Sequence, residues 1–436
     1  MQHFIIEDIH LLPDGSRESV QKNCYMEIKD GIIAEVETMP VPDHKHDLIP
    51  RIQGKGRWVL PGMYNTHMHT PMTLLRGTAD DVPLKEWLEK EIWPREAELD
   101  RDMVQAGTDL ALAEMIRSGT TAFLDMYHLH MDLVFEQTRQ AGMKAVLSRG
   151  MIGFGGQKEW EAKLSGAVEL AHYWNKEGNG KIKGMLFPHA PYTCPPAFMT
   201  QIASAAREHD LMIGTHAAET AGEVEEYKEN YGRTPAAHLD DLGFYEQQAV
   251  LTHGVHVSEE EISLLQKKRA FISHNPMSNA KLGSGTAPIS RFLEAGIPVT
   301  LGTDSSASNN NLDMFQEMRM AALMQKGVRM DPGAVGAEDI FRMATRNGAH
   351  LLGFEGDGLL QPGGPADFIM LDAEKPHLQP EHHMVSHVVY AASGQDVTDV
   401  FVDGNQLMKD RELVTIDEER ILYNARYQHE KLEQRR

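Results

Sequence analysis

The sequence predicts an α/β protein in which a (β/α)8 barrel of the TIM type is joined to a small β-sandwich built from both chain ends. Three observations predict this fold class. Short apolar runs alternate with helical stretches over about 60–359, which is the rhythm of a parallel sheet. Eight candidate strands occur in that stretch, and eight is the number that a barrel needs. Strand-like runs with tight-turn signals occur near both chain ends.

The first strands stand at the beginning of the chain. Phe4 to Leu11 is an apolar run, and the turn Pro13-Asp14-Gly15 follows it. Cys24 to Ile28 and Ile32 to Val36 flank Asp30-Gly31, a dipeptide that favours a tight hairpin. These residues predict β-structure before the barrel begins.

The same texture returns toward the C-terminus. Ala366 to Leu371 follows a run of Gly and Pro, and Val397 to Val402 leads into a second turn at Asp403-Gly404. We therefore expect the two ends to form one unit, followed by a helix from about Asp417 to Glu433. The predicted division is 1–59 with 360–415 for the composite sandwich, 60–359 for the barrel and 416–436 for the C-terminal helix.

The barrel strands have an unusual feature at their ends. The eight candidate strands end near His67, Asp125, Ser148, His189, His216, His253, His274 and Asp304. All but one of these residues are His or Asp. Since the active site of such a barrel lies at the carboxyl ends of its strands, these residues predict a catalytic site there. Among the helices, Asp102 to Arg117 has an apolar stripe on one face and Gly119 as a terminator.

The composition excludes several classes of protein. The 436 residues carry a formal net charge of −22, which argues against a general nucleic-acid surface because phosphate binding needs clustered Lys and Arg. No run approaches the roughly 20 apolar residues of a membrane helix. Only Cys24 and Cys194 are present, so a disulfide framework is not expected. We expect a soluble, cytoplasmic protein with no nucleic-acid or membrane partner.

The first metal-binding motif is His67-Met68-His69. Residues two apart in a strand point to the same face, so both imidazoles can address one ion. Taken alone, a structural histidine pair is an equal alternative. A second His-x-His, at His128 and His130, also follows a strand end and stays open as a contact with the site.

The next motif places a nitrogen ligand and a carboxylic acid close together. His216 closes a short apolar run and would supply a third nitrogen. Glu219 follows three residues later, where a carboxylic acid beside an activated water can carry protons in hydrolytic deamination. The alternative is that Glu219 merely favours the N-terminus of the next helix.

Asp304 and His253 complete the candidate site. Asp304 ends a β-rich run and can both bind the ion and accept a proton from its water, whereas an Asx turn or a helix cap is the structural alternative. His253 is either a further ligand or an electrophile that polarises the attacked bond. Because zinc has few ligands and must keep a position open for water, we favour the second role.

Taken together, the motifs resemble the amidohydrolase superfamily, and within it the 5-methylthioadenosine/S-adenosylhomocysteine deaminases. The resemblance spans nearly the whole chain. Its motifs are Pro61-Gly62, His67-Met68-His69, His216-Ala217-Ala218-Glu219, the stretch Ser273-His274-Asn275-Pro276-Met277-Ser278-Asn279, Ser284-Gly285-Thr286-Ala287-Pro288, Gly302-Thr303-Asp304 and Ser305-Ser306-Ala307-Ser308-Asn309-Asn310.

The resemblance implies one zinc ion per subunit, held by His67, His69, His216 and Asp304. Two-metal members have a bridging lysine at the end of the fourth strand, where this chain has Phe187-Pro188-His189.

The resemblance also implies the substrate contacts. Glu96 is expected to bind the ribose hydroxyls, and Arg149 and His189 to hold the nucleoside. The second arginine that is common in the family is missing from 155–165, which puts recognition of the homocysteine carboxylate in doubt.

The function that follows is zinc-dependent hydrolysis of an adenine-type nucleoside to its inosine analogue and ammonia. 5-Methylthioadenosine, S-adenosylhomocysteine and adenosine are the expected substrates, with Glu219, His253 and Asp304 as catalytic residues. Two alternatives remain: a related enzyme acting on another ring, such as a guanine-type deaminase or a triazine chlorohydrolase, and an inactive barrel that serves as a scaffold. A homo-oligomer is left open.

Overall fold

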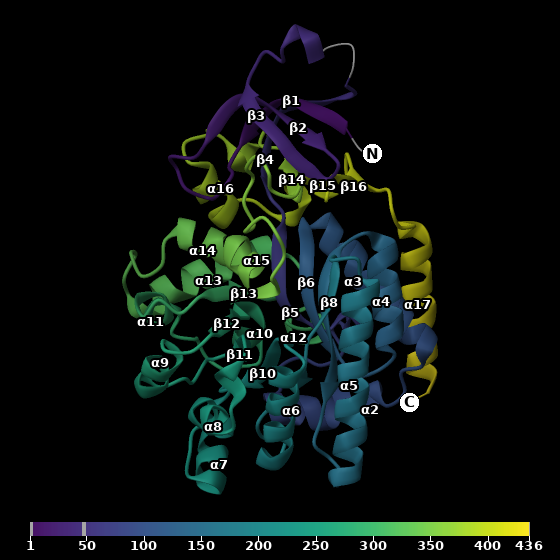
Figure 1. Ribbon diagram of the computed structural model, residues 1–436, viewed down its shortest axis with the longest axis vertical. Helices are drawn as coiled ribbons and strands as arrows, with labels where there is room; N and C mark the ends of the chain where they lie inside the picture. The colour runs from purple at the N-terminus through teal and green to yellow at the C-terminus, as the bar shows by residue number, and fades with distance from the viewer. Residues whose placement is uncertain (1–2, 46–48, 436) are drawn as a thin grey trace.

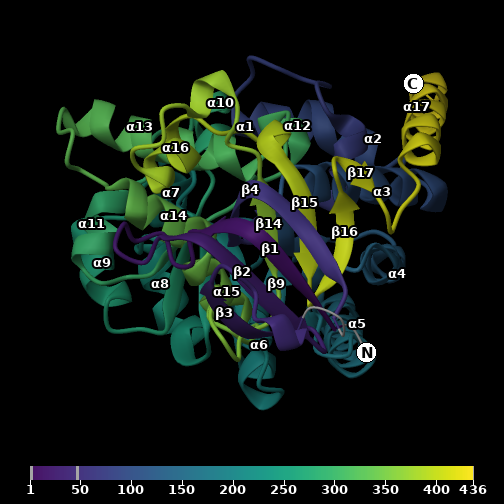
Figure 2. The ribbon, with the colours of Figure 1, turned by 90° about the horizontal axis from the view of Figure 1, so that it is seen from above.

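The structure is a computed structural model that describes residues 3–45 and 49–435. It has two parts, a barrel with its surrounding helices and a sheet that lies across one end of the barrel (Figure 1). Strands from both ends of the chain meet in that sheet, drawn in purple and yellow in the view from above (Figure 2).

Parallel strands form the barrel wall in two arcs. One arc has the order β5-β6-β7-β8, with β9 also paired to β7, and the other has the order β10-β11-β12-β13. Every pairing within the arcs is parallel, which confirms the predicted α/β class. The strands are β5 (Met63–Met68), β6 (Thr120–Tyr127), β7 (Lys144–Met151), β8 (Ile182–Gly184), β9 (Phe187–Pro188), β10 (Ile213–Ala217), β11 (Ala249–His253), β12 (Ala270–His274) and β13 (Val299–Leu301).

The two arcs close on each other at both sides. Leu186 and Ile213 form a parallel bridge on one side. On the other side the amide of Asp304 donates to the carbonyl of His67 at 2.9 Å. Gly302 makes this second closure possible, because a Cβ at that position would lie 2.4 Å from Asn275 Oδ1 and 2.8 Å from the His67 amide nitrogen. The last strand can therefore approach the first closely enough to bring Asp304 beside His67.

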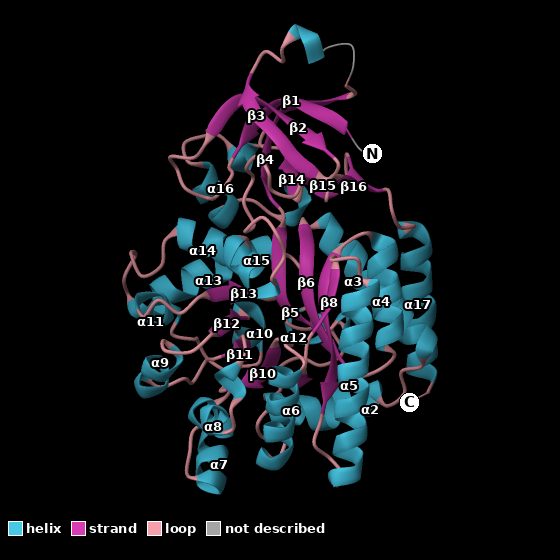
Figure 3. Cartoon of the chain, viewed as in Figure 1, coloured by secondary structure: helices cyan, strands magenta, loops and turns pink. Residues whose placement is uncertain are grey.

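Helices cover the outside of the barrel (Figure 3). The sequence prediction of a helix over Asp102 to Arg117 is confirmed by α3, which begins one residue earlier and is capped by the Asp100 side chain at the Met103 amide. The helices are α1 (Leu84–Glu86), α2 (Trp93–Glu96), α3 (Arg101–Arg117), α4 (Met131–Ala141), α5 (Gln157–Glu177), α6 (Pro196–Glu208), α7 (Ala221–Tyr231), α8 (Pro235–Asp241), α9 (Glu259–Leu265), α10 (Pro276–Lys281), α11 (Ile289–Glu294), α12 (Ser306–Asn309), α13 (Met314–Arg329), α14 (Ala337–Ala344), α15 (Arg346–Leu352), α16 (Met384–Tyr390) and α17 (Glu418–Gln434).

Several short helical turns complete the described chain. The π-helical turn η3 joins α1 to α2, and it reappears below because it borders the site. The 3-10 turns are η1 (Asp43–Lys45), η2 (Thr70–Leu75), η4 (Phe244–Glu246), η5 (Pro376–Leu378) and η6 (Gly394–Asp396), and the π turn is η3 (Trp87–Ile92).

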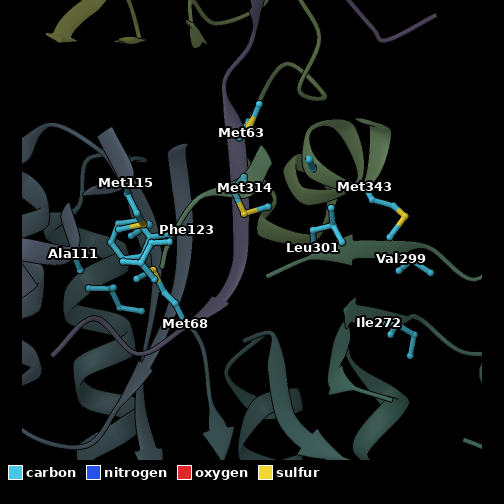
Figure 4. Packing of buried hydrophobic residues seen from close by; sticks show 14 of the residues in the cluster. Met63, Met68, Ala111, Met115, Phe123, Ile272, Val299, Leu301, Met314 and Met343 are labelled. Atoms are coloured by element: carbon cyan, nitrogen blue, oxygen red, sulfur yellow. The ribbon is translucent and has the colours of Figure 1, made fainter. Parts of the chain in front are cut away.

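Apolar side chains fill the space between the strands and the helices. Met63, Met68 and Phe123 from the first two barrel strands are fully buried, and Met115 of α3 lies beside Phe123 (Figure 4). Burying a side chain of this size contributes roughly 1.5–3 kcal/mol to the free energy of unfolding. This packing fixes the strands that carry the site residues at their carboxyl ends.

The β-structure shared by both chain ends is confirmed. Its strands form one hydrogen-bonded sheet in the order β17-β16-β15-β14-β4-β1-β2-β3. At its centre β4 pairs parallel with β1 and antiparallel with β14. The strands are β1 (His3–Leu11), β2 (Gln21–Lys29), β3 (Ile32–Thr38), β4 (Arg51–Pro61), β14 (Phe368–Leu371), β15 (Val397–Val402), β16 (Asn405–Lys409) and β17 (Glu412–Leu413).

The residue ranges assigned to the separate parts stay a prediction. β4 runs across the boundary placed between 59 and 60, and residues 1–2, 46–48 and 436 of the assigned ranges lie outside the described residues. The C-terminal helix is present as α17, with Asp417 as its cap. It is tied to α3 by an ion pair between Glu418 and Arg117. No helix in the described part of the chain is long and apolar enough to cross a membrane.

Candidate active site

Four predicted metal ligands meet at the carboxyl ends of three barrel strands. His67 Nε2 lies 3.2 Å from His216 Nε2 and 3.4 Å from Asp304 Oδ1. His69 Nε2 lies 3.3 Å from the same Asp304 oxygen. His67 and His216 belong to β5 and β10, His69 directly follows β5, and Asp304 stands in the loop after β13, so the barrel brings together residues far apart in the sequence.

The outer nitrogens of two of these rings are held by backbone carbonyls. His69 Nδ1 lies 2.5 Å from the Met126 carbonyl, and His216 Nδ1 lies 2.6 Å from the His189 carbonyl. A carbonyl only accepts, so Nδ1 carries the proton in each ring and the Nε2 lone pair points inward. This is the tautomer that a metal ligand requires.

Asp304 is held by donors on its other oxygen. Ser278 and Ser308 donate to Oδ2 at 2.6 and 3.0 Å, whereas Oδ1 accepts the Ser305 amide at 2.7 Å and faces the histidines. Burial alone would raise the pKa of this carboxyl, but the neighbouring His67 and His69 hold the pKa well below its ordinary value. The cap of the following helix α12 is Ser305, which excludes the helix-cap alternative for Asp304.

Three separations among the donor atoms, each of which involves His67 or Asp304, suit one divalent cation. Tetrahedral zinc with bonds of about 2.0–2.1 Å separates its ligand atoms by roughly 3.3 Å, and the three measured separations are 3.2, 3.3 and 3.4 Å. All four side chains are buried. Two sets of three residues have donor atoms within 4.8 Å of one another: His67 with His69 and Asp304, and His67 with His216 and His253. The two sets share His67, and the second includes His253 in place of a predicted ligand.

His253 lies beside this cluster but has different neighbours. Its ring stacks on His216, with ring centroids 5.5 Å apart. Its Nδ1 lies 2.9 Å from the side-chain nitrogen of Asn279, and its Nε2 lies 3.5 Å from Glu219 Oε2. Burial lowers the pKa of His253 to about 3, so the ring is neutral near pH 7.

Glu219 faces the cluster from the loop after β10. Burial, with the nearby Asp304 carboxylate, raises the pKa of Glu219 well above its ordinary value, which favours the protonated acid. The N-terminus of α7 is capped by Thr220, and Glu223 accepts the amides of Ala218 and Glu219 at 3.0 and 2.8 Å. Glu219 is therefore not the cap of this helix, and its side chain lines the cavity instead.

A cavity of about 410 Å³ opens over these residues. Histidines, Asp304 and Glu219 line its floor, whereas its wall is mostly aromatic and aliphatic. The wall residues come from α1, η3, α2 and the loops after β6, β7 and β9 and include Leu84, Trp87, Leu88, Ile92, Trp93, Leu129, Ile152, Phe154 and Tyr192. This volume is typical of a small-molecule site with a few convergent polar groups.

Comparison with known proteins gives this site a family. The sequence model described as the amidohydrolase family matches residues 58–407. The chain belongs to the amidohydrolase family. A relative from Halalkalibacterium halodurans, named 5-methylthioadenosine/S-adenosylhomocysteine deaminase, is 48% identical over 429 residues, which cover 97% of this chain and 98% of the relative.

Solved structures agree with this assignment. An adenosine deaminase from Xanthomonas campestris with bound zinc has a TM-score of 0.92 and 34% identity, and the match covers 99% of each chain. A variant of atrazine chlorohydrolase from Arthrobacter aurescens has a TM-score of 0.90 and 23% identity, covering 98% of this chain and 100% of that one. The second likeness shows a shared fold alone.

Two of the predicted substrate contacts line the cavity of this amidohydrolase, and one does not. Glu96 is buried and accepts a hydrogen bond from Tyr127 Oη at 2.6 Å. His189 lies at the floor, with its Nδ1 2.9 Å from Thr193 Oγ1. Arg149 is not among the lining residues; its guanidinium instead lies against α5, where a Cβ added at Gly166 would meet Nη1 at 2.7 Å.

Other residues of the amidohydrolase site were not foreseen from the sequence. Asn279 and the two serines on Asp304 belong to motifs that carried the resemblance, but no role was assigned to them. Tyr127 gave no signal beyond ending a strand. Of the second His-x-His, which was left open as a contact with the site, His128 lines the cavity and His130 is not among the lining residues.

Proposed function

We propose that this chain is a zinc-dependent aminohydrolase that converts adenine-type nucleosides, 5-methylthioadenosine above all, into their inosine analogues and ammonia. The relative from Halalkalibacterium halodurans is named for 5-methylthioadenosine and S-adenosylhomocysteine, and the Xanthomonas campestris structure is named an adenosine deaminase. These names support the substrate class.

The observation that carries the proposal is the position of Glu219. A buried acid with a raised pKa lies 3.5 Å from His253 and shares the cavity floor with the cation-binding cluster. Hydrolytic deamination needs such a proton donor, because a ring nitrogen must be protonated as water attacks the neighbouring carbon.

The side chains divide the reaction among them. A divalent cation held by His67, His69, His216 and Asp304 supplies Lewis acidity that makes water a competent nucleophile. Asp304, which is anionic, accepts the proton of the attacking water. Glu219 donates its proton to the ring nitrogen beside C6.

His253 and Glu219 then complete the exchange. His253 offers a hydrogen bond to the charge that develops as the C6–O bond forms. The C6–N bond breaks as the exocyclic nitrogen takes the proton relayed from Asp304 and leaves as ammonia. The C6 hydroxyl returns its remaining proton to the Glu219 carboxylate and becomes the carbonyl of the inosine analogue. One water is consumed for each ammonia released.

Zinc, and one ion per subunit, are the metal assignment that we propose. Three imidazoles and one carboxylate suit zinc, and the solved adenosine deaminase carries it. At the end of the fourth strand, where a second ion would need a bridging group, the buried Phe187 instead stacks on His67 with ring centroids 6.0 Å apart. An apolar ring at that place supports a single ion.

The cavity wall supports a neutral 5′ substituent on the nucleoside. Aromatic and aliphatic residues form most of it, and the described lining contains no Lys or Arg. A methylthio group can pack on such a surface, whereas the charged end of S-adenosylhomocysteine must remain hydrated at the mouth. The hydrogen bond from Tyr127 to Glu96, which lines the cavity, supports the role of Glu96 as an acceptor for the ribose hydroxyls.

The alternatives differ in product. A triazine hydrolase would release a ring substituent other than the adenine amino group, and the likeness to atrazine chlorohydrolase extends to the fold only. An inactive scaffold would not need the complete set of cation-binding residues. A cytoplasmic location and a homo-oligomeric state stay predictions.

A panel of substrates tests the proposal directly. Zinc-loaded enzyme is mixed with 5-methylthioadenosine, S-adenosylhomocysteine, adenosine, guanine and atrazine, and ammonia, chloride and ultraviolet absorbance are followed. We expect ammonia and an inosine-type spectrum from 5-methylthioadenosine. Turnover of guanine or atrazine with no turnover of any adenine nucleoside would overturn the assignment.

A further inference from the structure

Two buried asparagines converge on one nitrogen of His253. Asn279 Nδ2 lies 2.9 Å and Asn275 Nδ2 lies 3.5 Å from His253 Nδ1. Both asparagines are fully buried, and His253 is 1% exposed. Neither the proposed function nor the comparisons give Asn279 a task, although its contact with His253 is the shorter of the two.

The chemistry of this contact fixes which ring nitrogen carries the proton. An amide N–H only donates, so the nitrogen that it faces must have a free lone pair. A proton on His253 Nδ1 would point at two donors in a buried site, which is strongly unfavourable. The neutral ring therefore has its proton on Nε2.

The proton on Nε2 decides what His253 can do. A cation ligand must offer a lone pair, and the Nε2–H bond of His253 faces the cavity instead, 3.5 Å from Glu219 Oε2. His69 and His216 show the opposite arrangement, since backbone carbonyls hold the proton on Nδ1 and leave Nε2 free. The outer nitrogen thus faces a carbonyl in His69 and His216, which suits a cation ligand, and an amide donor in His253, which suits a hydrogen-bond donor to the cavity.

The backbone at His253 supports a dedicated placement of the ring. Its φ is +77°, in the left-handed region that a residue with a Cβ seldom adopts. The loop that follows is tied to the neighbouring strand end, because the amides of Gly254 and His256 donate to the carbonyls of Ala217 and Ala218. These bonds hold His253 beside Glu219 in spite of the unfavourable backbone angle.

We propose that Asn279 is a positioning residue that sets the tautomer of His253, so that this histidine donates a hydrogen bond to the reacting group instead of joining the cation's ligands. The donor role rests on the proposed function, whereas the tautomer follows from the contacts alone. Asn279 acts through His253 and does not touch the substrate.

The first experiment measures the tautomer in the unaltered enzyme. Histidine is labelled with 15N in the zinc-loaded protein, and the His253 signal is identified as the one missing from His253→Gln. We expect a protonated Nε2 and an unprotonated Nδ1, because two amides face Nδ1. A protonated Nδ1 would overturn the proposal. The measurement needs no substrate, so its outcome is separate from that of the substrate panel.

The second experiment replaces the donor by an acceptor. Asn279→Asp keeps the shape of the side chain but presents carboxylate oxygens, which move the ring proton to Nδ1 and expose the Nε2 lone pair. We expect kcat to fall on the order of 10²–10³-fold, as when one donor to a developing charge is lost. We also expect X-ray absorption at the zinc edge to show a further nitrogen ligand.

A matched variant controls for the added charge. Asn175 Oδ1 on α5 accepts the Gly184 amide at 2.9 Å, far from the site, and Asn175→Asp keeps that acceptor. We expect full activity and an unchanged zinc environment from it. If Asn279→Asp is as active as Asn175→Asp, Asn279 has no positioning role. If Asn279→Asp does not fold, the tautomer of the unaltered enzyme still decides.

Discussion

The floor and the wall of the cavity are built in different ways. On the floor, hydrogen bonds hold the outer atoms of the reactive side chains: carbonyls hold His69 and His216, hydroxyls hold Asp304, and an amide holds His253. The wall consists mainly of apolar side chains from helical turns and loops, and Phe154 there is 62% exposed.

This difference separates chemistry from selection. Floor residues are fixed by the strands and by the hydrogen bonds to their outer atoms. A change there therefore alters the proton positions and the charge at the reacting atoms. Wall residues are placed by packing, so a change there alters the affinity for the nucleoside and the choice among nucleosides. Floor variants should therefore act on kcat, and wall variants on KM and on the choice of substrate.

His216→Ala should have the largest effect. It removes one nitrogen from the cation-binding cluster and leaves three of the four predicted ligands. We expect the zinc content of the purified protein, measured by mass spectrometry, to fall well below one ion per chain and turnover to become undetectable. Retention of full zinc content and activity would break the assignment of the floor.

Glu219→Gln should follow, because the amide keeps the size of the side chain but cannot donate an acidic proton. We expect kcat to fall roughly 10²–10⁴-fold, with zinc content and KM nearly unchanged. A steady-state assay with 5-methylthioadenosine checks this. A variant that turns over normally would show that another group carries the proton.

The pH dependence of the unaltered enzyme gives a further test of Glu219. The pKa of Glu219 is raised by burial, and only its protonated form donates. We therefore expect kcat/KM to decline as pH rises through that pKa, and this decline to be absent from the residual activity of Glu219→Gln. A basic decline that survives in the variant belongs to a different group.

On the wall side, Phe154→Arg should change selection by a few-fold, as expected for an exposed ion pair. The guanidinium at the cavity mouth can pair with the carboxylate of S-adenosylhomocysteine. We expect the ratio of kcat/KM for 5-methylthioadenosine to that for S-adenosylhomocysteine to decrease, with kcat for 5-methylthioadenosine unchanged. An unchanged ratio would place the nucleoside's 5′ end elsewhere in the cavity.

Tyr127→Phe should have an effect of similar size. It removes the hydrogen bond of 2.6 Å that holds Glu96, without removing any group that touches the reacting atoms. A loss of about 1 kcal/mol corresponds to about a fivefold rise in KM at constant kcat. Comparison of adenosine with 2′-deoxyadenosine checks the cause, since only a ribose with both hydroxyls uses Glu96 fully.

Much of the fold and of the floor could be predicted from the sequence. The functional residues lie at or directly after the carboxyl ends of the strands, so His67, His69 and His216 stand in local patterns that can be recognised. Helix α3 and the hairpins at both ends also have local signals. These features depend on short stretches of sequence, which is why they could be predicted.

The rest depends on contacts between distant segments. Nothing local shows that Asn279 faces His253 or that Ser278 faces Asp304, because each pair forms only when the barrel closes. The wall has a further difficulty, since apolar residues in a helical turn such as Trp87 resemble ordinary core residues. The contact of Arg149 with the nucleoside stays a prediction: its guanidinium lies against α5, and burial together with the Arg149 charge lowers the pKa of His128, which lines the cavity.

The central strand of the composite sheet has a consequence for how the chain is made. β4 leads directly into the first barrel strand, and its antiparallel partner β14 lies at Phe368–Leu371. During synthesis the ribosome releases β4 long before β14, so one edge of β4 has no partner until the barrel has emerged. The composite sheet is therefore complete only after β14 has been translated, and a chain that stops before β14 leaves one edge of β4 unpaired.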